Sequence, residues 1–461
     1  MGHRTNRREF LKHTTLAGVG FWTAGGIALA NKDSANDRLR FACIGIGGKG
    51  DSDSSHAAQF GDVVAICDID DKFLDHKAAG DKFKNAKKYN DFRKMFDEMG
   101  KDIDAVTVST PDHTHAPASV MAMKMGKHVY CQKPLCHDVY EARVMRETAA
   151  KMKVATQMGN QGTAHPSLRS GVEVMQSGAL GAIKEVHVWT NRPVWPQAPK
   201  VTERPKSEPA PKHVHWDLFL GSAPERPYSG VKQDNGHPPY HDFNWRGWWD
   251  FGTGALGDMA CHTMNMPFMG LKLGYPDSIV AECGDLNRET YPSWATVTYQ
   301  FPARDSLPAV KLVWYEGQKD GKKNLPPLDL FLGEKPSDSA SLIVGEKGTM
   351  YSPSDYGERW ILLPKKQFAG FHNPTPTLPR HKSKDDDSNQ KAEWVAAIKG
   401  GPIALANFDY AGMLAEAVLL GNVAIRHQGK KLEWDGPGMT IKNDSDANQN
   451  LKREYRKPWT L

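Results

Sequence analysis

The sequence predicts an α/β protein with two parts: an N-terminal parallel, doubly wound sheet, and a following α+β part with a large open, mostly antiparallel sheet. Three observations predict this arrangement. A glycine-rich loop follows the first apolar run after residue 38, strand-like and helix-like segments then alternate as far as residue 158, and strand-like runs with alternating or β-branched residues follow from residue 159 onward. The length of 461 residues suits two ordinary domains rather than one.

The first thirty residues have the pattern of an export signal. Arg7 and Arg8 precede a mildly apolar, glycine-containing stretch, and Ala28-Leu29-Ala30 has the form of a cleavage site. We therefore expect a twin-arginine signal over 1–30, a linker over 31–37, and passage through the twin-arginine export machinery to the periplasm or another exported location. The stretch falls short of the roughly 20 apolar residues of a spanning helix, but an uncleaved signal that anchors the protein in a membrane is the alternative.

The composition is that of a globular protein with no sign of a nucleic-acid partner. The formal net charge is only +5, and most of it comes from the first thirty residues. Six cysteines are scattered without the paired spacing of a zinc site, and we interpret them as packing residues. Whether Cys131 and Cys136 pair is left open by their separation in the sequence.

The first part begins with a glycine loop typical of dinucleotide-binding, or Rossmann, domains. An apolar run over 39–46 leads into Gly-Ile-Gly-Gly-Lys-Gly, and a helix is expected to follow. Here Gly45 permits the tight turn, Gly47 lets the backbone approach a pyrophosphate, and Gly50 allows the helix to pack closely on the strand. Gly48 belongs to the same loop, and we assign all four glycines to cofactor binding.

A carboxylate stands where such a domain would hold the adenosine ribose. A second buried strand is expected over 63–67, and Asp68 follows it at about the spacing of 20 residues from the glycine loop that the fingerprint requires. A carboxylate there can accept from both ribose hydroxyls and would repel a 2′-phosphate, so NAD is expected rather than NADP. These features predict an NAD-binding domain over residues 38–158.

The alternation of strands and helices continues beyond Asp68, as in a parallel sheet. Further strands are expected over 104–109, 128–131 and 154–158, and helices over 116–125 and 139–152. The loop after residue 109 would lie at the carboxyl edge, where such sheets bind ligands. We assign Thr110, Pro111, His113 and His115 in this loop to cofactor binding or helix capping; because no third ligand accompanies the two histidines, no metal is expected.

Two further motifs carry a resemblance to a known family. Lys133 and Pro134 follow a strand, and Asp258 and His262 have the i, i+4 spacing that places both side chains on one face of a helix. The chain thereby resembles the Gfo/Idh/MocA oxidoreductases, the family of glucose-fructose oxidoreductase and inositol dehydrogenase, whose members carry Glu-Lys-Pro and Asp-x-x-x-His at these points. This chain departs from the first motif, since Gln132 stands in place of the glutamate.

The resemblance covers the chain from about residue 38 to the C-terminus and implies a catalytic centre of Lys133, Asp258 and His262, with Lys133 also beside the cofactor. We expect His262 to act as general base on a substrate hydroxyl, Lys133 to stabilise the developing alkoxide, and Asp258 to orient the hydroxyl or the histidine. Lys133 and His262 could exchange roles, because burial decides which of them holds the proton. The resemblance also implies a homo-oligomer.

Substrate contacts are expected on both sides of the second motif. Asn160, Gln161 and His165 follow the strand at 154–158, where members of the family often present side chains to the substrate. Arg246 and Trp249 lie in a segment dense in aromatic and hydrogen-bonding residues, a mixture that suits sugars. Tryptophan clusters also pack domain interfaces, and that remains the alternative for this segment.

The second part is predicted over 159–461. Its strand-like runs include 184–190, 295–301 and 309–315, and helices are expected on one face of the sheet. A late helix over 404–426 could return to pack against the first part.

Together these features predict an exported NAD(P)-dependent oxidoreductase that transfers hydride between a nicotinamide and the hydroxyl-bearing carbon of a sugar or polyol. One alternative is a redox-neutral enzyme that cleaves or isomerises a glycoside with tightly bound, recycled NAD; export favours such recycling, because free NAD is scarce outside the cytoplasm. Another is a noncatalytic dinucleotide-binding protein, but its expected mark, loss of Lys133, Asp258 or His262, does not occur in this sequence.

Overall fold

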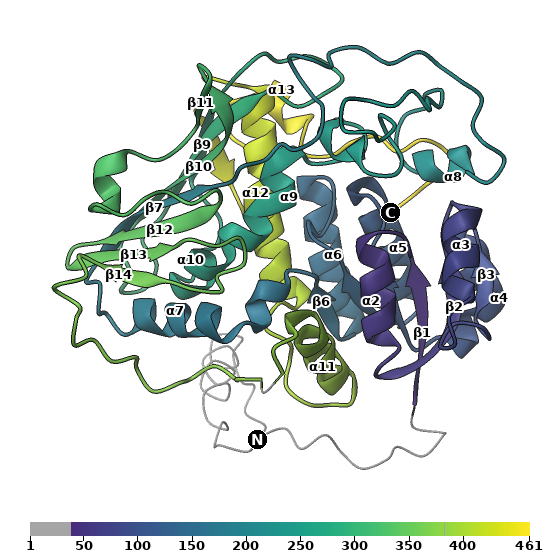
Figure 1. The fold of residues 1–461 in the computed structure, drawn as a ribbon, viewed down its shortest axis with the longest axis horizontal. Helices are drawn as coiled ribbons and strands as arrows, with labels where there is room; N and C mark the ends of the chain where they lie inside the picture. The colour runs from purple at the N-terminus through teal and green to yellow at the C-terminus, as the bar shows by residue number, and fades with distance from the viewer. Residues whose placement is uncertain (1–37, 382) are drawn as a thin grey trace, which may run out of the picture.

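The computed structural model describes residues 38–381 and 383–461, so the predicted signal and linker lie outside the described residues. Two sheets lie side by side with helices between them (Figure 1). The first is a six-stranded parallel sheet with the strand order β3-β2-β1-β4-β5-β6, and the second is larger and mixed. The predicted fold class, a parallel doubly wound sheet followed by a mostly antiparallel one, is confirmed.

The first sheet and its helices follow the predicted alternation. The strands are β1 (Leu39–Ile44), β2 (Gly61–Cys67), β3 (Lys87–Tyr89), β4 (Ala105–Val108), β5 (His128–Cys131) and β6 (Thr156–Met158). The helices are α2 (Lys49–Ala57), α3 (Asp71–Ala78), α4 (Phe92–Met99), α5 (Asp112–Lys124) and α6 (Val139–Met152). The bounds of β5 and α6 are those expected from the sequence, whereas α5 begins earlier than residue 116, directly after Pro111 as its N-cap residue.

Local chemistry explains these elements. The strands β4 and β5 are short apolar runs because helices cover both faces of a parallel sheet. The helices α3, α4 and α6 each begin after an aspartate, Asp70, Asp91 and Asp138, whose side chain accepts a hydrogen bond from a backbone N–H of the first turn. The strand β3 escapes a search for apolar runs because it is short and mostly exposed.

The second sheet is antiparallel except where β7 pairs with β10. Its strands are β7 (Ile183–Trp189), β8 (Ser278–Cys283), β9 (Trp294–Phe301), β10 (Val310–Lys319), β11 (Lys322–Lys323), β12 (Ala340–Gly345), β13 (Gly348–Ser352), β14 (Ile361–Leu363), β15 (Leu432–Asp435) and β16 (Thr440–Ile441). The helices of this part are α7 (Pro166–Gln176), α8 (Trp216–Leu220), α9 (Gly254–Thr263), α10 (Asn265–Gly270), α11 (Asp386–Ile398), α12 (Phe408–Arg426) and α13 (Ser445–Asn448).

The late helix α12 lies between the two sheets and packs against α6 of the first part (Figure 1). Arg143 of α6 makes a buried ion pair with Glu416 of α12, with 2.8 Å between Nη2 and Oε1. The helix begins at Phe408, later than the predicted residue 404, because Asn407 caps it. Its length and apolarity would suffice for a membrane span, but most of the helix is buried inside the protein. The chain thus returns to its first part after building the second sheet.

One long segment connects β7 to α9 and passes over the first sheet (Figure 1). It spans residues 190–253, and we call it the covering segment. Val214 within it forms an antiparallel bridge with Asp70, just beyond the end of β2, and the N–H of His215 donates to the carbonyl of Ile69 at 2.9 Å. The second part of the chain therefore closes over the edge of the sheet at which a parallel fold binds its ligand.

Candidate active site

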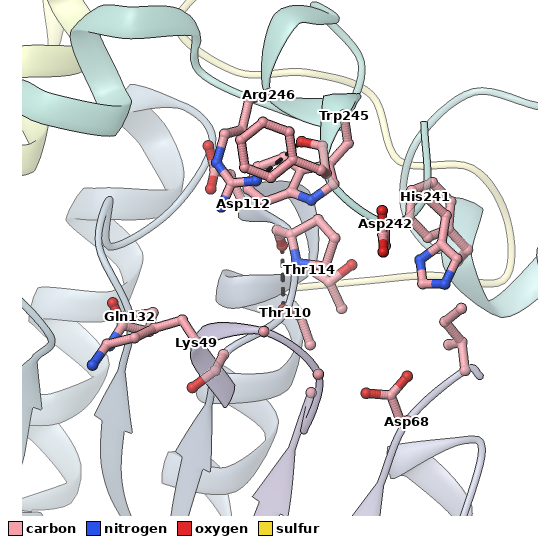
Figure 2. A pocket seen from close by; sticks show the side chains of 18 of the residues that line it. Lys49, Asp68, Thr110, Asp112, Thr114, Gln132, His241, Asp242, Trp245 and Arg246 are labelled. Atoms are coloured by element: carbon pink, nitrogen blue, oxygen red, sulfur yellow. Dashed lines mark hydrogen bonds between the residues drawn. The ribbon is translucent and has the colours of Figure 1, made fainter. Parts of the chain in front are cut away.

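A cavity of about 600 Å³ lies between the end of the first sheet and the covering segment. Figure 2 shows Asp68 on the strand side and Arg246 with Trp245 on the opposite wall. We call the part formed by the glycine loop and Asp68 the cofactor end. The part formed by Lys133, Arg192, Arg246, Asp258 and His262 is the reaction end; all five residues line the same cavity.

The glycine loop at the cofactor end has no room for side chains at two positions. Gly45 has φ +74°, and a Cβ there would lie 2.7 Å from the carbonyl group of Ser109. At Gly50 a Cβ would lie 2.0 Å from the carbonyl oxygen of Gly45, so the helix α2 can pack on the strand only with glycine. Gly47 and Gly48 line the cavity, and no side chain of the described residues caps α2. The amides at this helix terminus can therefore receive an anion such as a pyrophosphate.

Asp68 is held in place by the backbone around it. Its Oδ2 accepts from the N–H of Ile46 at 2.8 Å, and its Oδ1 accepts from the N–H of Asp70 at 3.0 Å. Burial raises the pKa of Asp68 above its ordinary value, although these two N–H groups and His241 oppose the shift. The carboxyl group lines the cavity beside the glycine loop, where a ribose would follow the pyrophosphate.

Lys133 and Asp258 meet at the reaction end. The Nζ of Lys133 donates to Oδ1 of Asp258 at 2.9 Å and to its carbonyl oxygen at 2.6 Å. Arg192 and Arg246 place their Nε atoms 3.7 Å and 3.5 Å from the same carboxylate. Burial alone would raise the pKa of Asp258, but Lys133 and the two arginines outweigh burial and lower it to about 2. Asp258 is therefore an ionised carboxylate among three cations.

His262 follows Asp258 by one turn of α9 and lies at the same end of the cavity. Its buried ring packs edge-on against Tyr356, with 4.6 Å between the ring centroids, and its Nδ1 has no hydrogen-bond partner among the described residues. Burial, followed by the positive charge of Lys133, lowers the pKa of His262 well below its ordinary value. The imidazole is neutral near pH 7, which is the state that a general base requires.

The contacts of Gln132 explain why this chain has glutamine where the family has the glutamate of Glu-Lys-Pro. Its Nε2 donates to Oδ2 of the buried Asp53 at 2.8 Å. The other oxygen of Asp53 accepts from Lys391 of α11 at 2.8 Å, and Lys49 lies 3.6 Å from it. A glutamate at position 132 would place a second carboxylate against Asp53, whereas the amide of Gln132 can donate to it. In this chain the buried carboxylate beside the Lys133 loop is therefore supplied by Asp53 of α2 and not by residue 132.

Three residues at or beside the reaction end were not predicted from the sequence: Arg192, which belongs to it, and Asp112 and Tyr356, which line the same cavity. Arg192 follows β7 without any motif around it. Asp112 lies between Pro111 and the two histidines that drew attention in that loop. Its Oδ2 accepts from Oγ1 of Thr253 at 2.6 Å, and burial raises its pKa to about 7. An acid at the start of a helix at the carboxyl edge was the signal that could have indicated it.

Two residues that were assigned to cofactor binding or helix capping, His113 and His115, do not line the cavity. His115 lies between two loops, with Nδ1 2.8 Å from the carbonyl oxygen of Pro134 and Nε2 2.7 Å from that of Thr110. His113 binds the covering segment, with Nε2 2.7 Å from the carbonyl oxygen of Phe219. Both histidines brace the loops around the site, while their neighbours Thr110 and Pro111 line it.

The predicted substrate contacts divide in the same way. Gln161 and Arg246 line the cavity. His165 instead caps α7, Asn160 is buried and donates to the carbonyl of Cys261, and the indole of Trp249 is buried between Tyr291 and Arg426. Trp249 therefore packs in the hydrophobic core and does not line the cavity. All six cysteines are buried free thiols; Cys131 donates to the carbonyl of Leu135 and Cys136 to that of Asp138.

Comparison with known proteins gives consistent matches. The Gfo/Idh/MocA family model described as an NAD-binding Rossmann fold matches residues 39–160, and the family's C-terminal α/β domain model matches residues 169–311. Together they cover more than half of the chain. Among solved structures, the WlbA dehydrogenase from Bordetella pertussis, in complex with NADH and UDP-GlcNAcA, has a TM-score of 0.58 at 15% identity, covering 86% of this chain and 99% of that one. At that identity the likeness concerns the fold.

Two curated relatives are similar over their shared segments. A glycosyl hydrolase family 109 protein from Solibacter usitatus is 33% identical over 156 residues, which are 30% of this chain and 35% of the relative. Inositol 2-dehydrogenase from Salmonella paratyphi B is 32% identical over 130 residues, 27% of this chain and 37% of the relative. The matches thus span little more than a third of the length of either relative.

Proposed function

The chain belongs to the Gfo/Idh/MocA oxidoreductase family, and from this premise we propose that it is an NAD-dependent oxidoreductase that moves hydride between a nicotinamide and the hydroxyl-bearing carbon of a sugar or polyol. One observation carries the proposal: Lys133, Asp258 and His262 converge in a cavity that also contains the glycine loop. The similarity to an inositol dehydrogenase supports a polyol-like substrate.

The described residues fit a dinucleotide along this cavity. The uncapped amides of α2 would hold the pyrophosphate, and Asp68 would accept from the hydroxyls of the adenosine ribose. Thr110 and Pro111 line the path between the two ends. Because the carboxyl group of Asp68 lines the cavity where the adenosine ribose would lie, a 2′-phosphate would meet an acidic group there, and we propose NAD rather than NADP. When bound, the nicotinamide supplies the acceptor for hydride from the substrate carbon.

The chain's own residues would handle the proton. His262 is neutral and would accept the proton of the substrate hydroxyl, while the carbon that bears this hydroxyl loses its hydride and becomes a carbonyl carbon. The ammonium group of Lys133 would donate a hydrogen bond to the same oxygen and stabilise its developing negative charge. Asp258 is held ionised and fixes the position of Lys133 through the 2.9 Å contact. The covering segment would exclude water from the reacting atoms.

Two wider features of the prediction remain proposals. We propose that the pattern of residues 1–30 directs export by the twin-arginine route, either with cleavage or as an uncleaved anchor. We also propose a homo-oligomer, which rests on the family alone. Export is measured by fractionating cells that produce the full chain, and the oligomeric state by light scattering of the purified protein.

The proposed oxidoreductase is tested by mixing the protein with NAD or NADP and a panel of sugars and polyols while recording absorbance at the wavelength of the reduced nicotinamide. We expect at least one sugar or polyol to reduce NAD, with NADP used less well. A protein that binds neither dinucleotide, or that reduces neither with any member of the panel, would contradict the proposal.

A second candidate is a redox-neutral enzyme that cleaves or isomerises a glycoside while its NAD is reduced and reoxidised. The similarity to a glycosyl hydrolase family 109 protein favours it, as does the bridge from Val214 to Asp70 over the cofactor end, which would slow release of a dinucleotide. Net reduction separates the two candidates. An oxidoreductase leaves one reduced cofactor for each molecule of product, whereas an enzyme that recycles its NAD leaves none. In heavy water the recycling enzyme would also replace the hydrogen on the carbon next to the oxidised carbon with deuterium.

A further inference from the structure

The reaction end carries more positive than negative charge. Lys133, Arg192 and Arg246 all face the one carboxylate of Asp258, at 2.9 Å, 3.7 Å and 3.5 Å. Among the described residues, Asp258 is the only carboxylate within ion-pair distance of either arginine. One negative charge cannot balance three positive charges, so the wall of the reaction end keeps an uncompensated positive charge.

The neighbouring acids supply only part of the missing negative charge. Asp112 is the other acid at this end, and burial raises its pKa to about 7, so it is partly neutral at neutral pH. The carboxylates near Lys49 are already in use: Asp387 lies 2.6 Å from Lys49, and Asp53 lies 2.8 Å from Lys391. These two lysines and two aspartates balance one another. The excess at the reaction end therefore stays with Arg192 and Arg246.

Both guanidinium groups are accessible, and that of Arg246 is also held in position. Each arginine side chain keeps about a quarter of its surface exposed, 23% for Arg192 and 24% for Arg246, and both line the cavity. Arg246 is fixed by a hydrogen bond to the carbonyl of Phe243 at 3.0 Å and lies 4.3 Å from the ring centroid of Trp245 (Figure 2). A guanidinium held in this way can bind a planar anion with two parallel hydrogen bonds.

We propose that the substrate is a sugar that bears a carboxylate, such as a hexuronate, and that Arg192 and Arg246 bind this group while Lys133 and His262 act on a hydroxyl of the same ring. The proposal rests on the oxidoreductase function and narrows its substrate class. A neutral sugar would displace water from the two cations without giving them a counter-charge, which is costly in a closed cavity. A carboxylate provides that counter-charge. It also offsets the positive potential that Lys133 and Arg192 impose on His262, and so makes that histidine a better base.

The test is calorimetric binding of matched sugar pairs to the NAD-loaded protein: glucose and glucuronate, galactose and galacturonate, mannose and mannuronate, with glucose 6-sulfate as a second kind of anion. We expect at least one hexuronate to bind about tenfold or more tightly than its neutral partner. In Arg192→Gln and Arg246→Gln this preference should fall by about tenfold. Arg288→Gln is the matched control, because Arg288 is exposed and lies outside the cavity lining, and it should keep the preference.

Three results would overturn the proposal. One is that no hexuronate is preferred over its neutral partner, and another is that glucose 6-sulfate binds more tightly than every hexuronate. The third is that the two variants lose affinity for NAD rather than for the acid, which would assign the arginines to the cofactor's pyrophosphate. Titration of NAD alone is a separate arm. A wild-type protein that does not bind NAD refutes the oxidoreductase function itself, and the sugar pairs are then compared without cofactor.

Discussion

The two ends of the cavity are built in opposite ways. The cofactor end is made mainly from one short stretch of chain: the glycine loop connects β1 to α2, Asp68 directly follows β2, and the backbone N–H groups of Ile46 and Asp70 hold its carboxyl group. The reaction end brings Lys133 of the first part together with Arg192, Arg246 and α9 of the second. Side chains make the contacts of the reaction end, where three cations, Lys133, Arg192 and Arg246, face the one carboxylate of Asp258.

The two ends therefore separate cofactor binding from catalysis. A dinucleotide can be held by backbone geometry that depends little on any one side chain. Chemistry on a hydroxyl needs a donor, a base and a carboxylate at one point, and these can come from any segment that the fold brings there. We therefore expect substitutions at the cofactor end to change the affinity for NAD, and substitutions of Lys133, Asp258 or His262 at the reaction end to change turnover.

The largest effect is expected at Lys133. In Lys133→Met the donor to the developing alkoxide is lost, so turnover should fall by about a thousandfold, while the dissociation constant of NAD should change by less than about threefold. Steady-state rates and NAD titration measure the two quantities. Lys151→Met, at an exposed position on α6, is the control. A variant that keeps more than a tenth of wild-type turnover would remove Lys133 from the chemistry.

The contact that joins α2 to the Lys133 loop gives the next effect. In Gln132→Glu two carboxylates would meet at Asp53, and the free energy of unfolding should fall by about 2 kcal/mol, measured by urea denaturation. Adding Asp53→Asn should restore part of the loss, because the pair then again contains one amide and one carboxylate. Equal losses in Gln132→Glu with and without Asp53→Asn would show that the two side chains do not interact.

The two acids of the reaction end should respond to pH with opposite signs. The pKa of Asp112 is raised from 3.8 to about 7, so its contribution to stability is present below pH 4 and is lost as the pH rises through 7. The pKa of Asp258 is lowered to about 2, so its contribution is present above pH 4 and is lost as the pH falls through 2.

Denaturation midpoints across this pH range check both signs. Asp112→Asn should remove the loss of stability between pH 4 and 7, while Asp258→Asn should be less stable than the wild type above pH 4 and approach it toward pH 2. If both variants shift the profile in the same direction, the assigned environments of the two carboxyl groups are wrong.

The smallest effect is expected at the cofactor end. In Asp68→Asn the side chain keeps one acceptor for the backbone but loses its charge, so NAD affinity should fall by about tenfold and the preference for NAD over NADP should narrow. Titration of both dinucleotides measures this. Unchanged selectivity would mean that Asp68 does not contact the ribose.

The contrast between local contacts at the cofactor end and long-range contacts at the reaction end also determines how much of the site the sequence predicts. The cofactor end is local, so the glycine loop, Asp68 and the bounds of β5 and α6 follow from patterns of a few residues. Lys133 and Asp258 were joined through the family's motifs, because nothing in a separation of 125 residues indicates contact. Arg192 has no motif around it. Its place in the cavity depends on the path that the covering segment takes after β7. Trp249 and His113 were assigned from residue type and from their places before Asp258 and at the carboxyl edge, and neither criterion shows where a side chain points: the structure places both outside the cavity lining.

The most direct test of the account is to measure NAD affinity and turnover on the same preparations of wild type, Asp68→Asn and Lys133→Met. We expect Asp68→Asn to weaken NAD binding but to retain turnover at saturating NAD, and Lys133→Met to retain NAD binding but to lose turnover. If both variants lose both properties, or if Lys133→Met alone abolishes NAD binding, then cofactor binding and catalysis are not divided between the two ends of the cavity.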